Sequence, residues 1–327
     1  MNNLFIVGTP SHYFNLLECI KKFDLKTSES KLLFLNNNSQ SSDEIIDNFI
    51  KKYINTNEWK SVQRIPLWDS ISQKIYSIHN IKIMTLFVFK ILRMSLFKKY
   101  NYLVVSQVDQ FYSKCFYFIA SANKIISLDE GNAVFRIVDQ RNSNKRSSLF
   151  MPKRIIFFSS YSIKVERPDI VVRCNYDFSK NKLKTSKVNH NELWFIGSPY
   201  IEDRLINKDL YWTYIRKIRN DYKGKSIKYF PHRREKKKYL KILEKDYQFS
   251  IIKIDCPIEF FLLDNDQLPR IISGFLSAAL LNLRNITNAN IQIHSYFIDS
   301  NNIESFSGEL IKIKNQYLNS DIEVIDL

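Results

Sequence analysis

The chain of 327 residues is long enough for two domains of ordinary size. Hydrophobic residues make up 45% and charged residues 25%, a balance that supports packed cores and argues against intrinsic disorder. The four cysteines lie far apart in the sequence, which argues against a disulfide framework or a zinc motif. The formal net charge of +16 indicates an anionic partner, and charge alone leaves open nucleic acid, an acidic membrane face and a phosphorylated substrate.

The first residues are typical of a strand, without the basic region and long apolar run of a secretory signal. The most apolar stretch, residues 81–96, carries Lys82, Lys90 and Arg93. It is shorter than the ~20 apolar residues that span a bilayer. We therefore expect a cytoplasmic protein in which this stretch is a buried amphipathic helix, with membrane contact as the alternative.

In the first half of the chain, short apolar runs alternate with helical patterns. The runs predict strands at residues 4–7, 31–35, 61–66, 102–106, 124–128, 154–158 and 170–173. Helices are predicted at 11–23, 43–53, 71–99 and 112–120. Ser42 is the expected N-cap of the second helix. Residues 140–153 are predicted to be a loop, and the Lys-, Asn- and Ser-rich residues 178–191 an interdomain linker.

The second half repeats the same alternation. Strands are predicted at 193–196, 226–230, 249–252, 270–273, 290–294 and 322–325. Helices are predicted at 209–219, 234–245, 275–283 and 303–317. This rhythm predicts parallel sheets covered on both faces. We therefore expect an α/β protein with two doubly wound, Rossmann-like domains, residues 1–188 and 189–327, facing a central cleft, with ligands at the carboxyl ends of the strands.

Two motifs follow predicted strands of the first half. Gly8-Thr9-Pro10-Ser11-His12 comes after the opening strand, where a substrate loop or a plain strand–turn–helix would lie. Asp129-Glu130-Gly131 places two acids at a strand end. A carboxylate there can remove a proton from a sugar hydroxyl, although a solvated turn or a helix cap is the commoner use of such residues.

Three motifs follow predicted strands of the second half. Pro231-His232-Arg233 precedes a helix, whose free N–H groups and dipole favour an anion; a basic surface loop is the alternative. Ser273-Gly274-Phe275-Leu276-Ser277 could donate to a phosphate or simply cap a packed helix. Gly197-Ser198-Pro199 ends a further strand. Four of the six glycines thus stand at predicted strand ends, where close approach of a ligand to the backbone is favoured.

The order of these motifs resembles the bacterial sialyltransferases of glycosyltransferase family 52. The resemblance also includes an acidic position at Pro257-Ile258-Glu259 and the Arg234-Glu235 pair that ends the Pro-His motif. Two positions depart from the family pattern. Arg233 stands where the family has proline, which leaves an anion-binding role in place, and Ala278 replaces the second hydroxyl residue after Ser277, which weakens the role of Ser277.

The resemblance implies a GT-B-like fold and an inverting, metal-independent transfer of sialic acid from CMP-sialic acid to a terminal galactose of a bacterial surface glycan. It assigns Asp129 as general base, with Glu130 as the other candidate, and His232 as the group that assists the leaving phosphate. A substrate contact is implied for Gly131, and contacts on the donor side for Gly197, Ser198, Pro199, Pro231, Arg233, Glu259, Ser273, Gly274 and Ser277. Acceptor contacts are implied for Gly8, Thr9, Pro10, Ser11 and His12, on the N-terminal domain.

The closest alternative is a transferase of the same fold that uses a hexosyl donor. The expected partners are a nucleotide sugar, a glycan acceptor and an anionic membrane surface, with a homodimer as a further expectation. The absence of a known nucleic-acid-binding motif argues against a nucleic-acid partner. The resemblance implies that no cofactor or metal is needed, and the absence of an Asp-x-Asp signature at a predicted strand end is consistent with that expectation.

Overall fold

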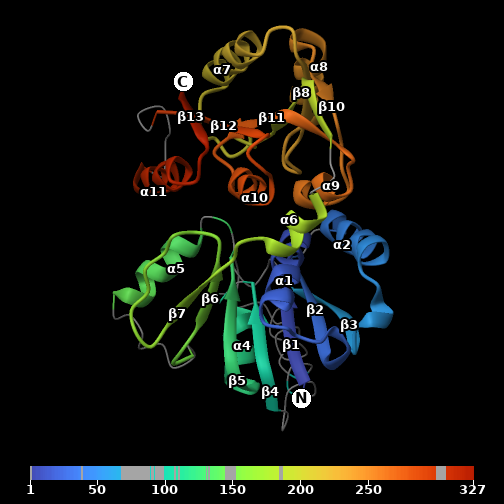
Figure 1. Ribbon diagram of the computed structural model, residues 1–327, viewed down its shortest axis with the longest axis vertical. Coiled ribbons are helices and arrows are strands. Elements are labelled where there is room, and N and C mark those ends of the chain that lie inside the picture. Colours follow the sequence, from blue (N-terminus) through green and yellow to red (C-terminus); the bar gives the residue numbers. More distant parts are fainter. Residues whose placement is uncertain are drawn as a thin grey trace, which may run out of the picture. The chain divides into compact units, whose positions relative to one another are not determined.

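The computed structural model (Figure 1) describes residues 2–37, 40–67, 89, 92, 99–106, 108–109, 111–129, 131, 133–143, 152–183, 187–299 and 307–327. The chain divides into two compact units, Met1–Cys174 and Asn175–Leu327. The division lies before residues 178–191, and the prediction of a linker there is wrong. Most of that segment forms helix α6 (Asp177–Leu183) and the start of strand β8 (Lys187–Ile196), both in the second unit.

The first unit is built on a parallel sheet of seven strands in the order β3-β2-β1-β4-β5-β6-β7. The strands are β1 (Asn2–Val7), β2 (Ser30–Asn37), β3 (Ser61–Leu67), β4 (Lys99–Val105), β5 (Ser121–Leu128), β6 (Ile156–Ser159) and β7 (Ile170–Arg173). Each neighbouring pair is parallel. The order reverses direction between β1 and β4, and in doubly wound sheets the carboxyl side of this switch point is where ligands bind.

The helices of the first unit follow the predicted strands. They are α1 (Pro10–Lys22), α2 (Gln40–Tyr53), α4 (Phe111–Ile119) and α5 (Ala133–Asn142). Helix α2 begins before Ser42, so the predicted N-cap lies inside the helix instead. Helix α5 includes residues 140–142, which corrects the start of the predicted loop. The helix predicted at 71–99 lies outside the described residues except Phe89 and Leu92, which are helical, and Lys99, which opens β4.

Aromatic side chains fill the core between β1, β2, α1 and α2. Phe5 meets Trp59 edge-on with ring centroids 5.8 Å apart, and Tyr13 meets Phe49 in the same way at 5.8 Å. All four side chains are buried. Edge-to-face pairs add to the hydrophobic gain of burying large rings, so this cluster anchors α1 on the sheet and fixes the loop between β1 and α1.

The second unit has a parallel sheet of six strands in the order β10-β9-β8-β11-β12-β13. Besides β8, the strands are β9 (Ser226–Phe230), β10 (Ser250–Ile251), β11 (Gln267–Phe275), β12 (Gln292–Phe297) and β13 (Glu323–Asp326). Its switch point lies between β8 and β11. The predicted helix start at residue 275 is wrong, because Phe275 is the last residue of β11.

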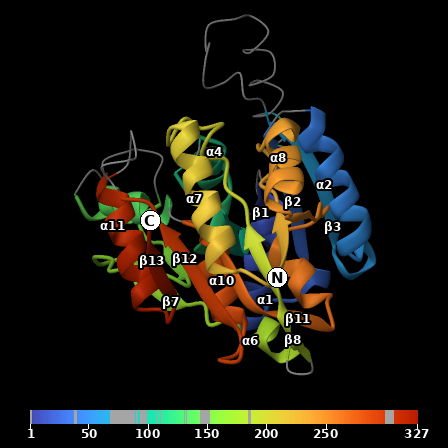
Figure 2. The same cartoon turned by 90° about the horizontal axis from the view of Figure 1, so that it is seen from above.

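The helices of the second unit cover this sheet. Besides α6, they are α7 (Lys208–Asp221), α8 (Lys237–Tyr247), α9 (Ile258–Leu263), α10 (Ala278–Ile286) and α11 (Ser307–Leu318). Helices α7 and α8 lie side by side (Figure 2). Their apolar residues share one buried cluster with β8, β9 and β11, which includes Phe195, Ile215 and Leu243. No helix in the described part of the chain is long and apolar enough to cross a bilayer.

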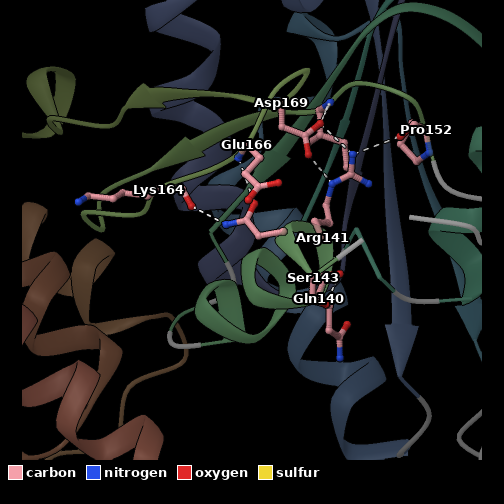
Figure 3. A network of polar contacts seen from close by, with 9 residues as sticks. Gln140, Arg141, Ser143, Pro152, Lys164, Glu166 and Asp169 are labelled. Atoms are coloured by element: carbon pink, nitrogen blue, oxygen red, sulfur yellow. Dashed lines mark hydrogen bonds and ion pairs between the residues drawn. The ribbon is translucent and has the colours of Figure 1, made fainter. Parts of the chain in front are cut away.

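A buried ion pair ties helix α5 to the amino ends of β6 and β7 (Figure 3). Arg141 donates from Nε to Asp169 Oδ2 at 2.5 Å and from Nη2 to Asp169 Oδ1 at 2.8 Å. Oδ1 also accepts from the backbone N–H of Ile155 at 2.8 Å, and Arg141 reaches the carbonyl of Pro152. Because both Asp169 oxygens and the Nε and Nη2 atoms of Arg141 have partners, this bidentate pair stabilises the amino edge of the sheet, opposite the edge where ligands are expected.

Candidate functional residues at two sheet edges

Asp129 directly follows β5 and is buried, with 5% of its surface exposed. Its Oδ2 accepts hydrogen bonds from the backbone N–H of Ser160 at 2.6 Å and from the Ser160 hydroxyl at 3.1 Å. Its Oδ1 is buried and accepts no hydrogen bond from the described residues. The side chain therefore neither caps α5 nor points into solvent, which removes both common alternatives for this acid.

Burial raises the pKa of Asp129 to about 6, because the charged carboxylate is desolvated. The hydroxyls of Ser159 and Ser160, the Ser160 amide and the more distant charge of Arg173 lower it in part. A carboxyl group with a pKa near 6 is ionised at neutral pH and is a stronger base than an exposed aspartate. The free lone pairs on Oδ1 give it a place to accept a proton.

Helix α1 brings a second predicted motif to the same edge of the sheet. The Asn15 amide of α1 donates to the backbone carbonyl of Asp129 at 3.2 Å. Thr9 is the N-cap of α1 and its hydroxyl accepts from the His12 N–H at 3.3 Å. Pro10 occupies the first turn, where its fixed φ and missing N–H suit a helix start. Gly8 is buried, and Ser11 is exposed.

His12 is buried and its ring is held by the backbone. The N–H of Gly8 donates to His12 Nδ1 at 3.3 Å, which places the proton of the neutral ring on Nε2. Burial lowers the pKa of His12 to about 4, so the ring is neutral at physiological pH. His12 Nε2 is therefore an N–H donor, and no described residue accepts from it.

The two other residues of the acidic motif differ in what the structure describes. Gly131 has φ of +54°, a left-handed conformation that favours glycine and turns the chain from β5 into α5. Glu130 lies outside the described residues. Asp129 is thus the acid of this pair whose surroundings are defined.

In the second unit, the loop after β9 presents the other predicted catalytic residue. His232 is half-buried, and its Nδ1 accepts from the backbone N–H of Arg234 at 3.3 Å. Burial and the charges of Arg234 and Arg233 lower the pKa of His232 to about 4. Without a bound anion, the His232 ring is therefore neutral with its proton on Nε2, and this form can donate a hydrogen bond to an anion. Arg233 is exposed beside it, and Pro231 is partly buried at the start of the loop.

Glu235 is a site residue that sequence reasoning missed, although it stands in the Pro-His motif. Its Oε1 accepts from the Tyr229 hydroxyl and its Oε2 from the His232 N–H, each at 2.6 Å. A Cβ added to Gly197 would overlap the Glu235 carboxylate and lie 2.8 Å from the Tyr229 hydroxyl oxygen. The glycine after β8 is therefore required by a packed carboxylate, which no periodicity or spacing in the sequence signals.

Ser277 and the residues after β8 lie at the switch point of the second sheet. Ser277 is the N-cap of α10, and its hydroxyl accepts from the Ala279 N–H at 3.3 Å. The hydroxyl proton stays available for another acceptor. Ser198 and Pro199 follow β8 and are buried, and the backbone N–H of Gly197 donates to the Phe230 carbonyl at 2.8 Å. These residues share one strand-end region because β8 is the neighbour of both β9 and β11.

The remaining residues predicted to contact the donor make contacts with other residues of the second unit. Ser273 is fully buried within β11 and accepts from the Tyr222 hydroxyl at 3.3 Å, away from the strand end. Gly274 lets β11 approach β8, since a Cβ there would lie 2.9 Å from the Ile196 carbonyl oxygen. Glu259, on α9, accepts from Asn282 of α10 at 2.7 Å, and burial raises its pKa. Ser277 and Glu259 thus border α10, whereas Ser273 does not.

No family model matches the sequence, and a search of curated proteins finds no match. Solved structures share its fold. The UDP-GlcNAc 2-epimerase of Methanocaldococcus jannaschii has a TM-score of 0.54 and 12% identity, over 90% of this chain and 83% of that one. The heptosyltransferase WaaC of E. coli, solved with ADP, has a TM-score of 0.50 and 11% identity, over 99% and 93%. The expected fold is therefore confirmed: two doubly wound α/β domains of GT-B type.

Among the described residues, no group of three or more His, Cys, Asp or Glu side chains is arranged to hold a metal ion. The described residues with chemistry at the two sheet edges are instead a buried acid, two neutral imidazoles and several hydroxyl groups. This set suits the transfer of protons and the binding of an anion.

Proposed function

We propose that this protein is a glycosyltransferase of GT-B fold that transfers sialic acid from CMP-sialic acid to a terminal galactose of a bacterial surface glycan. The observation that carries the proposal is Asp129, a buried acid at the carboxyl edge of the first sheet with one oxygen that has no partner among the described residues. The order of the Asp-Glu-Gly, Gly-Ser-Pro, Pro-His and Gly-Phe-Leu-Ser motifs supports the sialic acid donor in particular.

Asp129 acts as the general base. The acceptor hydroxyl donates its proton to Oδ1, which no described residue contacts by a hydrogen bond, as the hydroxyl oxygen forms a bond to the anomeric carbon of the donor. Ser160 holds Oδ2 and so fixes the direction of the carboxylate. The bond from the anomeric carbon to the phosphate oxygen breaks on the opposite face, and the configuration inverts.

His232 assists the departure of CMP. The bond electrons pass to the leaving phosphate, whose charge increases in the transition state. A neutral imidazole donates from Nε2 to this oxygen, and the exposed Arg233 adds a charged donor. Contact with a phosphate raises the pKa of the ring, because it favours the protonated form.

The other motif residues bind the two substrates. The Ser277 hydroxyl and the first N–H groups of α10 face the donor phosphate, with Gly197 and Ser198 beside them. Glu259 contacts the nucleoside. On the first unit, Thr9 and His12 contact the acceptor sugar, with Ser11 at the exposed rim. No metal takes part in the proposed reaction.

Release of CMP from CMP-sialic acid in the presence of a galactoside tests the proposal. We expect Asp129→Ala and His232→Ala each to lower turnover about 100-fold or more, in line with typical acid–base contributions. Near-native turnover in either variant would refute the role given to that residue.

A hexosyl donor is the alternative within the same fold. A thermal-shift screen with CMP, CDP, UDP and GDP separates the two, because a bound nucleotide raises the melting temperature by mass action. Stabilisation by CMP alone supports a CMP-sugar donor. Stabilisation by UDP or GDP, together with hydrolysis of the matching nucleotide hexose, would indicate a hexosyl donor instead of CMP-sialic acid.

Attachment to an anionic membrane face fits the net charge of +16. Helix α8 carries four exposed lysines, and Lys238 lies over the Tyr239 ring at 4.8 Å from its centroid. The four are Lys237, Lys238, Lys241 and Lys245. Flotation with vesicles containing phosphatidylglycerol should recover the protein at low salt, and recovery should fall when two of these lysines are replaced by glutamate. No binding at low salt would rule out this attachment.

A further inference from the structure

The Glu235 carboxylate joins strand β9 to the loop between β9 and α8. Glu235 Oε1 accepts from the hydroxyl of Tyr229, which is buried within β9. Glu235 Oε2 accepts from the backbone N–H of His232, and the Glu235 N–H donates to the His232 carbonyl at 2.9 Å. The reciprocal pair of bonds resembles a capping box, in which a side chain and a backbone amide satisfy each other. The backbone of His232 is thus held at both its N–H and its C=O.

The carboxylate is itself held against the end of β8. Gly197 leaves room for it, since any Cβ at that position would overlap the Glu235 side chain. Burial raises the pKa of Glu235 to about 7, with a further contribution from Glu202, while the bonds from Tyr229 and His232 lower it. A side chain so placed has little freedom, and its direction is set by β8 and β9 together.

The ring of His232 takes its orientation from this closed loop. Its Nδ1 accepts from the Arg234 N–H inside the same turn, which leaves Nε2 as the donor. Without the Glu235 side chain the His232 amide loses its acceptor and the turn loses one closing bond, so the Arg234 N–H is left to orient the ring in a less constrained loop. Glu235 has no need to touch a substrate to affect the reaction.

We propose that Glu235 is a positioning residue that holds the His232 loop in the form that directs Nε2 to the leaving phosphate. The inference rests on the function proposed above, in which His232 assists the leaving group. Glu235 acts through the hydrogen bonds of its side chain to Tyr229 and His232, and not through its charge.

A neutral side chain of the same shape can make the same bonds. A glutamine at position 235 can direct its carbonyl oxygen to the His232 N–H and its amide to the Tyr229 oxygen. The Tyr229 hydroxyl can then donate to the Tyr211 hydroxyl, which lies 3.4 Å away. Glu235→Gln should therefore retain the loop, and Glu235→Ala should not.

A double-mutant cycle on turnover tests the inference. We expect Glu235→Ala to lower kcat by about 10- to 100-fold, the usual cost of losing a group that orients a functional side chain. Glu235→Gln should stay within about threefold of wild type. In the His232→Ala background, Glu235→Ala should have no further effect, because it acts only through the ring. Equal losses in both backgrounds would overturn the inference.

The His232 amide provides a readout that does not depend on activity. In ¹⁵N NMR spectra, its proton should exchange slowly in the wild type and in Glu235→Gln, and fast in Glu235→Ala. Tyr211→Phe is the matched control, since it removes a hydroxyl from the same cluster without touching Glu235 and should leave the exchange slow. Slow exchange in a folded Glu235→Ala would refute the positioning role. A wild type with slow exchange and no sialyl transfer would instead refute the proposed function.

Discussion

The two edges of the first sheet each hold a buried aspartate, and the two side chains are used in opposite ways. Asp169, at the amino edge, is 4% exposed and both its oxygens are bonded, to Arg141 and to the Ile155 N–H. Asp129, at the carboxyl edge, is 5% exposed, forms no ion pair among the described residues and leaves Oδ1 unpartnered. Two carboxylates that are equally buried therefore differ in how their oxygens are bonded.

The contrast separates an acid whose two oxygens both have partners from one that keeps an oxygen without a partner among the described residues. A buried carboxylate stabilises a fold only when its charge is paired and its oxygens accept hydrogen bonds, as both oxygens of Asp169 do. Asp129 keeps an unsatisfied oxygen at the edge where parallel sheets bind ligands, and the fold bears the cost of desolvating it. If this interpretation is right, substitutions at the two positions should have opposite effects on stability and turnover.

The largest expected effect is on folding, at Asp169. Asp169→Ala leaves the Arg141 guanidinium buried without its counter-ion, which should lower the free energy of unfolding by about 3–5 kcal/mol. Urea denaturation followed by circular dichroism measures this loss. The control is Asp47→Ala, which removes a half-exposed partner of Arg64 at 3.4 Å and should cost under about 1 kcal/mol. Similar losses in both variants would contradict the structural role of Asp169.

The next effect is on turnover, at Asp129. Asp129→Asn retains an acceptor oxygen for Ser160 and removes the base, so turnover should fall about 100-fold or more in a folded protein. Asp24→Asn makes the same chemical change at an exposed position after α1 and should leave turnover unaltered. If Asp129→Asn unfolds, or if it keeps normal turnover, then Asp129 has a structural role like that of Asp169 and is not the base.

The pH dependence of stability sharpens the same comparison. The pKa of Asp129 is about 6 in the folded chain, above its usual value of 3.8, so the folded state binds this proton more tightly. The contribution of Asp129 to the free energy of unfolding should therefore fall as pH rises from about 4 to about 6, by up to roughly 3 kcal/mol, and level off above. Glu235, whose pKa is raised to about 7, acts in the same direction, and His12 and His232, whose pKa values are lowered to about 4, act in the opposite one. The contribution of Asp129 is therefore measured as the difference between urea titrations of the wild type and of Asp129→Asn from pH 4 to pH 8. The same pH dependence in both proteins would assign the effect to another group.

The smallest expected effect compares two serines of the second unit. Ser277 caps α10 at the strand edge, whereas Ser273 is bonded inside the sheet to Tyr222. Ser277→Ala should weaken CMP binding by about tenfold, through the loss of a donor and of the helix cap. Ser273→Ala should leave the affinity unchanged. Isothermal titration calorimetry measures both affinities for CMP. Equal losses of affinity in the two variants would indicate that Ser273 also contributes to the binding site.

The alternation of apolar strands and amphipathic helices was readable from the sequence, because parallel strands buried on both faces are continuous apolar runs. The strand predicted at residues 226–230 matches β9 residue for residue, and most others differ only at their ends. The helix at α6 was missed because its Lys- and Asn-rich sequence resembles a linker. It packs on α9 and α10, so tertiary contacts outweighed its weak propensity.

The amino-acid sequence by itself determined the α/β class, the two-domain plan and the strand-end positions of Asp129, His232 and Gly197, since these follow from periodicity and from turn residues. Only the tertiary structure decided which acid is satisfied and which is free, and that Glu235 holds the His232 loop. The physical reason is that burial and hydrogen bonding are set by neighbours distant in the chain: Ser160 for Asp129, and Tyr229 with Gly197 for Glu235.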